Sequence, residues 1–328
     1  MDLAGALGEA LRVGIGPQAA AYAVAAIGLN LHFGYTGLLN FGHVGFFLVG
    51  AYGAAITVDA GGSLWLGIGV GLLASVALAL VLGVPTLRLR ADYLAIVTIA
   101  VAEILRLVVR ANAARPLTGG VFGIRAVAGS FYDLNPIPPG TYGALGLVFS
   151  HRSLWVIIAG WTLAGACTVV VWALVRSPWG RVLRAIREDE DAARSLGKNV
   201  FAYKLQSLVL GGALGALAGI LLMINQQSVV PDTYLAVLTF YTYTVLILGG
   251  TGTTWGPIVG SIVFWFLTQL TESLLRQAVQ SGSLGGLFDV QDLAALRFAL
   301  VGLGLILLMV FRPQGIFGRR AELQLDAT

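Results

Sequence analysis

Long apolar runs separated by short polar segments restrict what this chain can fold into more than any other feature. The runs 64–84, 153–175 and 201–224 each contain at most one charged residue, and about 20 apolar residues make a helix long enough to cross the hydrocarbon core of a bilayer. Within that core every backbone polar group must be bonded inside the protein, which leaves helices and closed barrels. Because the runs lack the alternating pattern of barrel strands, they predict membrane-spanning helices.

The low content of charged residues leads to the same conclusion. Of the 328 residues, 57% are hydrophobic and 11% are charged, whereas soluble domains contain about 25% charged residues. The net charge of +4 is explained by basic cytoplasmic loops, so it does not indicate a nucleic-acid partner. We predict an all-α polytopic membrane protein whose residues 1–328 form a single transmembrane domain surrounded by lipid.

The sequence predicts about nine spans, in a range of eight to ten because some segments are broken or re-entrant. Their approximate ranges are 18–33, 44–58, 64–84, 93–109, 153–175, 201–224, 235–248, 258–270 and 293–311. The loop after the fifth span and the C-terminal tail are basic, which places both in the cytoplasm. The N-terminus and the weakly hydrophobic loop 110–152, in which turns dominate, then lie outside. Residues 272–292 are interpreted as a polar connection, and residues 1–16 lack the features of a removable signal peptide.

Small residues recur at four-residue intervals in two of these spans. They are Gly67, Gly71, Ser75, Ala79 and Gly83 in the third span, and Gly211, Gly215 and Gly219 in the sixth. Residues four apart share a helix face, and small residues let helices approach closely in lipid. We interpret both series as packing faces, and the single cysteine, Cys167, as a small core residue.

The segment 34–43, GYTGLLNFGH, interrupts the apolar pattern at membrane depth. Irregular backbone at that depth is tolerated only where it is buried in protein or lines a wet cavity. Asn40 and His43 therefore either line a solute pathway or satisfy the broken helix end and pack in the core. The segment 249–257 is a second interruption, which is either part of a pathway or a tight turn between two spans.

Glu103 and Arg106 place two charges inside the fourth predicted span. Three residues apart on a helix, they share a face and can pair. Charges within a span are costly and point to function by default, so both are candidate pathway residues. The alternative is structural, because Arg106 lies near the helix end, where its side chain can reach the interface.

The stretch 176–204 is the longest strongly charged segment of the chain. It holds seven of the 20 Lys and Arg residues, with four consecutive acids, 188–191, at its centre. Ser177 followed by Pro178 is a helix start, and Gly197 is a helix stop. Apolar residues at helical spacing predict one short amphipathic helix between them; these are Val182, Leu183, Ile186, Ala193 and Leu196. The helix is either an ordinary cytoplasmic loop or a docking element for a soluble partner.

Five stretches spread along the chain resemble a known family. They are GLNLHFGYTGLLNFGHVGFF from Gly28, TLRLRADYLAIVTIAVAEILRLV from Thr86, SPWGRVLRAIREDEDAARSLGKNVFAYKL from Ser177, LGGTGTTWGPIVGS from Leu248 and FRPQGIFG from Phe311. In this order they are similar to the M-type permease subunit of the branched-chain amino acid ABC transporter family. The chain departs from the family pattern at Thr253-Thr254, where small residues are more usual, and in the looser segment 117–123.

The resemblance implies one subunit of a bacterial inner-membrane importer. A sister permease would form the pathway with it, two cytoplasmic ATPases would drive transport, and an extracytoplasmic binding protein would deliver the solute. The segment 176–204 would dock the ATPase as an amphipathic helix. The residues implied in docking are Trp179, Gly180, Arg181, Arg184, Ala185, Arg187, Glu188, Asp189, Glu190, Ala193 and Gly197.

Other functional classes find less support in the residues. The chain has no phosphate loop and no metal-binding motif, so we expect a permease without a cofactor that hydrolyses no ATP itself. An ion-coupled transporter would need an intramembrane titratable relay, for which Glu103 is the one good mid-span candidate. A membrane enzyme would need a cluster of catalytic side chains. Within the importer class, a urea or short-amide permease is the alternative.

Overall fold

The computed structural model is mostly helical in the part of the chain that it describes, which comprises residues 3–88, 91–144, 147–280, 296, 299, 302–303, 306 and 314–318. The longer helices are α1 (Leu3–Gly14), α2 (Pro17–Leu29), α3 (His43–Asp59), α4 (Leu64–Thr86), α5 (Ala91–Arg110), α8 (His151–Arg176), α9 (Pro178–Glu188), α11 (Val200–Gln226), α12 (Val237–Gly249) and α13 (Gly256–Gln280). The short ones are α6 (Arg115–Thr118), α7 (Gly129–Asp133), α10 (Glu190–Ser195), the π-helix η1 (Asn30–Tyr35) and the 3-10 turns η2 (Asn112–Ala114), η3 (Gly120–Phe122) and η4 (Pro231–Thr233). The predicted all-α membrane fold is confirmed.

Five helical segments in the described part are long and apolar enough to cross a membrane. They are α4, α8, α11, the segment Pro231–Gly249 that contains η4 and α12, and α13. The pair formed by α1 and the segment Pro17–Tyr35, bent by 45°, would make a sixth. The second and fourth predicted spans correspond to α3, which has 17 residues, and to α5, which carries four charged residues. The ninth predicted span, 293–311, lies almost wholly outside the described residues.

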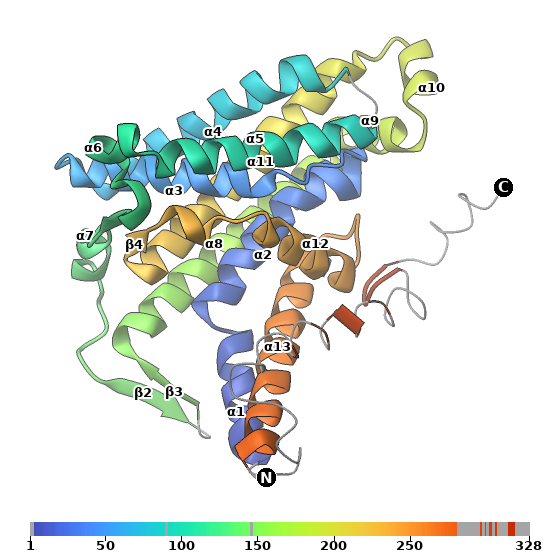
Figure 1. Cartoon of the computed structure of the whole chain (residues 1–328). Helices are drawn as coiled ribbons and strands as arrows, with labels where there is room; N and C mark the ends of the chain where they lie inside the picture. Colours follow the sequence, from blue (N-terminus) through green and yellow to red (C-terminus); the bar gives the residue numbers. More distant parts are fainter. Residues whose placement is uncertain are drawn as a thin grey trace.

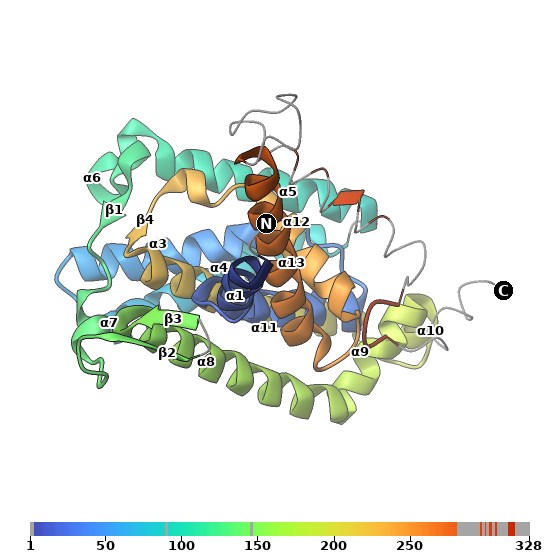
Figure 2. The ribbon, with the colours of Figure 1, turned by 90° about the horizontal axis from the view of Figure 1, so that it is seen from below.

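The helices α3, α4, α5 and α11 run side by side across the molecule, with α6 and α7 at one end and α9 and α10 at the other (Figure 1). Helices α1 and α13 extend together below this layer in Figure 1, and in the view from below they lie over its middle while the same two ends remain apart (Figure 2). Completely buried aromatic and aliphatic side chains such as Phe46, Phe47, Leu208 and Met223 fill the layer between α3 and α11. The charged segment 176–204 and the loop 110–152 are thus held at opposite ends of one packed body.

The loop 110–152 contains more regular structure than its turn-rich sequence predicts. Strand β1 (Ile124–Arg125) pairs antiparallel with β4 (Ser228–Val229), directly after α11. A hairpin of β2 (Thr141–Ala144) and β3 (Leu147–Ser150) leads into α8. The prediction of mainly irregular loop was therefore wrong at these strands, because β1 finds its partner about 100 residues away in sequence and β2 finds its partner in the next strand of the same loop.

Two helical segments were missed or cut short by the sequence analysis. Helix α1 precedes the first predicted span, and its Ala6, Ala10 and Gly14 are buried at four-residue spacing; an added Cβ on Gly14 would meet Phe266 of α13 at 3.1 Å. Helix α13 continues to Gln280, so the polar connection predicted from residue 272 begins too early. Polar side chains are compatible with this helix because Ser273 donates a hydrogen bond to Glu9 of α1, at 3.1 Å.

Candidate coupling surface and pathway residues

The corner between α8 and α9 is fixed by four consecutive residues, 177–180. The Ser177 hydroxyl accepts a hydrogen bond from the Trp179 N–H at 3.2 Å, and Pro178 occupies the first turn, where its missing N–H costs nothing. Gly180 is buried against the backbone of Val175, where an added Cβ would collide with the carbonyl oxygen. The Trp179 indole N–H donates to the Gln206 side chain of α11 at 2.8 Å. Helix α9 therefore leaves α8 in a defined direction.

The predicted single amphipathic helix is in fact two helices that meet at Asp189. This residue has an extended backbone, with φ −152° and ψ 109°, and its carboxylate accepts from the N–H groups of Asp191 and Ala192, both at 2.9 Å. The side chain thus caps α10 and stops α9. Because of the corner, Leu183, Ile186 and Ala193 are buried, whereas Leu196 is 78% exposed rather than on the same face.

One face of α9 is presented to the outside as a narrow stripe. Pro178, Arg181, Ala185 and Glu188 are all exposed, and their spacing of three and four residues places them on one side of the helix. We call these four residues the outer stripe. Gly197, with φ +76°, ends the α10 segment in the left-handed conformation that glycine allows.

Most of the acidic cluster is engaged within the chain. Asp191 pairs with Arg194 at 2.7 Å, and Glu190 pairs with Arg194 at 3.0 Å and with Lys204 of α11. Asp189 is the cap described above. These contacts tie α10 to α11, so three of the four acids hold the corner together and Glu188 alone projects from the outer stripe.

Arg184 and Arg187 turn back toward the helical body. Arg184 donates to the carbonyl of Val175 at 3.1 Å. Arg187 donates to the carbonyl of Gly34, in the π-helix η1 that begins the broken segment, and the carbons of its side chain lie beside Gly37, where an added Cβ would be 3.3 Å away. Helix α9 is thereby bonded directly to the interruption that the sequence predicted.

Asn30 links η1 to the second interruption, the loop 250–255. Its amide donates to the Thr253 carbonyl at 2.8 Å, and its side-chain oxygen accepts from the Gly252 N–H at 2.9 Å. An added Cβ on Gly34 would collide with the same oxygen. Sequence analysis missed Asn30 because its partners are more than 220 residues away.

The segment 314–318 returns to the same loop. The N–H groups of Ile316 and Phe317 donate to the carbonyls of Leu248 and Gly249 at 2.9 and 3.1 Å. Gly315 has φ +70°, and an added Cβ would lie 2.4 Å from the Ile247 carbonyl oxygen and 2.8 Å from the backbone nitrogen of Gly250. Two of the sequence stretches that carried the family resemblance are therefore joined by backbone hydrogen bonds.

Asn40 and His43 are both buried, at 1% and 0% exposure, and the structure adds His32 beside them. The Asn40 amide donates to Nδ1 of His32 at 3.2 Å, and Nε2 of His32 then donates to the carbonyl of Leu208. His43 donates from Nε2 to the Ala25 carbonyl at 3.2 Å, while its Nδ1 has no hydrogen-bond partner among the described residues. In this conformation the three side chains are buried in the packing between helices.

Glu103 and Arg106 form the predicted pair, at 2.6 Å. Arg106 is 8% exposed in its side chain and also bonds Asp232 of η4 at 2.8 Å, and Arg110 lies 3.5 Å from the same carboxylate. Asp232 was not a candidate from the sequence. The cluster ties the end of α5 to the segment after α11, at the α6–α7 end of the molecule.

The candidate packing glycines lie where helix backbones meet. On α4, an added Cβ would approach the Ala54 carbonyl to 2.9 Å from Gly67 and the Gly50 carbonyl to 2.5 Å from Gly71. On α11, Gly211 faces His32 and the backbone of Gly28, Gly215 faces His43, and Gly219 faces the backbone of Phe47. Every one of these positions is a contact with α2, η1 or α3 that has no room for a side chain.

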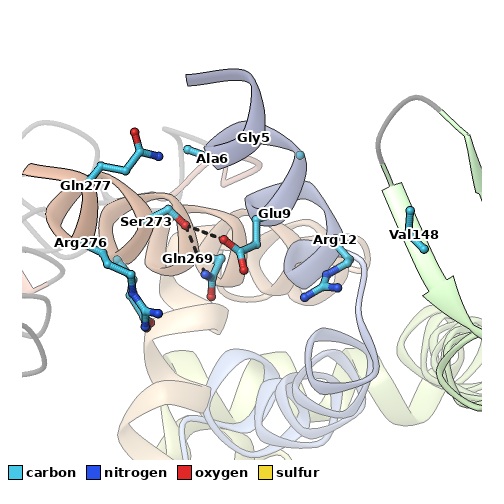
Figure 3. Close-up of a pocket in the computed structure, with 11 residues that line it drawn as sticks. Gly5, Ala6, Glu9, Arg12, Val148, Gln269, Ser273, Arg276 and Gln277 are labelled. Carbon is cyan, nitrogen blue, oxygen red and sulfur yellow. Dashed lines mark hydrogen bonds and ion pairs between the residues drawn. The ribbon is translucent and has the colours of Figure 1, made fainter. Parts of the chain in front are cut away.

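A polar pocket of about 530 Å³ lies between α1 and α13 (Figure 3). Ser273 bonds Glu9 there and accepts from Gln269 at 3.4 Å, and Arg276 pairs with Glu272 at 3.2 Å. Arg12 points into the same space in Figure 3. Among the described residues no group of three or more His, Cys, Asp or Glu side chains is placed to hold a metal ion.

Comparisons with known proteins point to one family. The family model described as "branched-chain amino acid transport system / permease component" matches residues 13–311. The high-affinity branched-chain amino acid transport system permease protein LivM of Escherichia coli K12 is 30% identical over 90% of this chain and 67% of its own length. The probable LivM of Methanocaldococcus jannaschii is 26% identical over 90% of both chains.

More distant similarity extends to a second type of permease and to one solved structure. The LivH permease protein of Salmonella typhimurium is 24% identical over 91% of both chains. The structure of PsaBC from Streptococcus pneumoniae in complex with Fab aligns with 98% of this chain and 94% of that chain, at 19% identity and a TM-score of 0.41.

Proposed function

The chain belongs to the family of branched-chain amino acid transport permease components, and from this we propose that it is the M-type transmembrane subunit of an ATP-driven importer for branched-chain amino acids. The LivM and LivH relatives bear names of that transport system. In this proposal residues 1–328 form one transmembrane domain in a bacterial inner membrane. A LivH-like sister permease completes the pathway, and an extracytoplasmic binding protein delivers the solute.

ATP hydrolysis belongs to two cytoplasmic partner subunits in this proposal, and α9 and α10 are the place where they dock. The proposal rests chiefly on the outer stripe, a helix face with one arginine and one glutamate that is exposed in the described structure and lies at the end of two long helices, α8 and α11. An exposed helix face that enters a groove of a partner is a known recognition mode. The α9–α10 end is then cytoplasmic and the α6–α7 end extracytoplasmic.

The contacts behind the outer stripe support a way of transmitting movement. Arg187 connects α9 to Gly34, and Asn30 connects η1 to the loop 250–255. A displacement of α9 by the ATPases would pull on both interruptions of the apolar spans. We infer that Asn40 and His43 move with the broken segment. We also infer that Glu103 and Arg106 belong to the extracytoplasmic end of the solute pathway.

Ala185→Glu tests the docking surface. Ala185 is exposed at the centre of the outer stripe, so the substitution leaves the fold intact but places a charge in a contact that must be desolvated. We expect ATPase binding to the purified permease to weaken on the order of tenfold or more, with loss of solute-stimulated ATP hydrolysis. The matched control is Ala113→Glu, an exposed alanine in η2 at the other end of the molecule.

Normal ATPase binding and hydrolysis by the Ala185→Glu complex would contradict the docking proposal.

Uptake of labelled leucine, isoleucine and valine into vesicles tests the solute separately. Transport of urea or a short amide in place of these amino acids would leave the coupling proposal intact and change the substrate class.

A further inference from the structure

A second pocket, of about 400 Å³, lies where α8 ends and α13 begins. It is lined by α8 and α9 on one side and by the loop 250–255 with Phe317 on the other. Helix α8 is long enough to span a membrane, and the pocket lies at the end of α8 that leads into α9. We take this end of a span as the level of the membrane surface. The proposed orientation makes this the cytoplasmic surface, and the site itself does not depend on that assignment.

Two arginines give the pocket a positive charge without a matching acid. Arg176 and Arg184 both line it, and none of the described residues that line it is acidic. Within the described part of the chain neither guanidinium forms an ion pair with a carboxylate; Arg184 donates to the Val175 carbonyl, and Arg176 lies over the Trp172 ring with its central carbon 4.4 Å from the ring centre. The pocket is therefore a concentrated, uncompensated positive site.

The aromatic side chains of the pocket indicate contact with lipid rather than with water alone. Trp172 and Trp255 are 40% and 60% exposed, and Tyr35 lines the same space. Tryptophan and tyrosine concentrate where a membrane meets water, since their rings are apolar and one end is polar. A tryptophan one turn before an arginine at the end of a span places an apolar ring toward the acyl chains and a cation at head-group level.

The opposite wall adds groups that favour an anion. Thr253 and Thr254 line the pocket immediately before α13, and the start of a long helix carries a partial positive charge. Asn30 holds this loop through the Gly252 N–H and the Thr253 carbonyl. The two arginines on one wall and the start of α13 on the other thus lie around the same pocket.

We propose that this pocket binds the phosphate head group of an anionic phospholipid. Basic pockets between spans on the cytoplasmic side are suited to such head groups. The arginines would hold the phosphate, and Trp172 and Trp255 would lie against the glycerol and upper acyl chains. A bound lipid would join α8 and α9 to the loop 250–255, beside the Arg187–Gly34 contact.

Native mass spectrometry of the delipidated full-length chain tests the proposal. We expect phosphatidylglycerol to bind more tightly than phosphatidylcholine, and Arg176→Gln with Arg184→Gln to lower the phosphatidylglycerol affinity about fivefold per arginine. The matched control, Arg115→Gln with Arg152→Gln, removes two arginines at the α6–α7 end and should leave the affinity unchanged. Arg176→Gln alone, expected to give a fivefold loss, replaces the double variant if that variant does not purify.

Four results would overturn the proposal. Equal binding of the two lipids would show that no anionic head group is selected, and unchanged phosphatidylglycerol affinity in the Arg176 variants would place any selection elsewhere. Full competition by millimolar inorganic phosphate would identify a site for the free anion instead. Loss of retained lipid on assembly with the ATPases would show that a partner's acidic side chain occupies the pocket. None of these readouts involves transport, so they stand apart from the proposed function.

Discussion

Single glycines decide how closely the helices of this protein approach. Gly215 lies in the middle of α11, where an added Cβ would be 2.9 Å from the His43 ring and 3.2 Å from Phe46. Contacts under 3.0 Å require a neighbour to move, and His43 is itself held by the Ala25 carbonyl and fully buried. A side chain at this position therefore has to separate α11 from α2 and α3 together.

Gly215→Leu is expected to prevent stable assembly or to lower the stability of the purified chain by about 3 kcal/mol, the upper end of the range for overpacked cores. Thermal unfolding in detergent measures the effect. Gly69→Leu is the matched control, since Gly69 lies in α4, is exposed, and an added Cβ would meet nothing within 4 Å. A Gly215→Leu chain that unfolds at the wild-type temperature would show that the helices accommodate a side chain there.

At the scale of elements, the corner at Asp189 determines which surface is offered to a partner. Asp189→Ala removes the cap of α10, at a cost of about 1 kcal/mol, so the amides of Asp191 and Ala192 should exchange hydrogen with solvent faster. Glu188→Ala removes the neighbouring acid without touching the cap and should leave exchange unchanged. Hydrogen-exchange mass spectrometry of residues 189–196 distinguishes the two variants. Equal exchange in Asp189→Ala and Glu188→Ala would contradict the capping role of Asp189.

The sequence predicted which segments become helices better than it predicted where they end. Apolar runs and small-residue spacing are local properties, and they identified α4, α8 and α11 together with the packing sides of α4 and α11. The corner at Asp189 was missed because helical spacing continues across it and any of four consecutive acids might have been the cap. The extension of α13 depends on Glu9, which lies 264 positions away from Ser273, and no local pattern contains that contact.

In the candidate site, too, local features could be predicted from the sequence and contacts between distant residues could not. The charged segment, both interruptions and the Glu103–Arg106 pair were evident from residue type and spacing. Asn30, His32 and Asp232 were not, because each acts through a partner on a distant helix or loop. A polar residue in an apolar run is visible in sequence, but the group that satisfies it becomes known only when the helices are packed.

Across the whole molecule, these contacts form a continuous path from the proposed docking surface to the interior. Helix α9 is bonded through Arg187 to Gly34, and the same broken segment continues through Asn40 to His43, against α11. Since Asn40 and His43 are buried here, a role in the pathway requires the segment to move. The structural alternative is that both side chains stay buried and satisfy the broken helix end throughout the transport cycle.

Cysteine labelling of the assembled importer distinguishes the pathway role of Asn40 and His43 from the structural role. In a Cys167→Ser background, Asn40→Cys and His43→Cys are expected to be unreactive toward a small water-soluble thiol reagent at rest, because both positions are at most 1% exposed. They should become reactive when ATP is trapped, as displacement of α9 pulls the broken segment away from α11. Adding Arg187→Gln, which removes the contact with Gly34, should suppress the change in reactivity while both cysteines stay in place.

Two control positions make the comparison quantitative. Ser63→Cys, on an exposed turn before α4, should react in both states and report reagent access. In the parent chain, which keeps Cys167, that buried cysteine should react in neither state. If the cysteines at positions 40 and 43 remain unreactive in both states in a complex that still transports, the pathway role is wrong and the buried cluster is structural. State-dependent labelling that persists in the Arg187→Gln background would instead show that movement reaches the broken segment by a route other than α9.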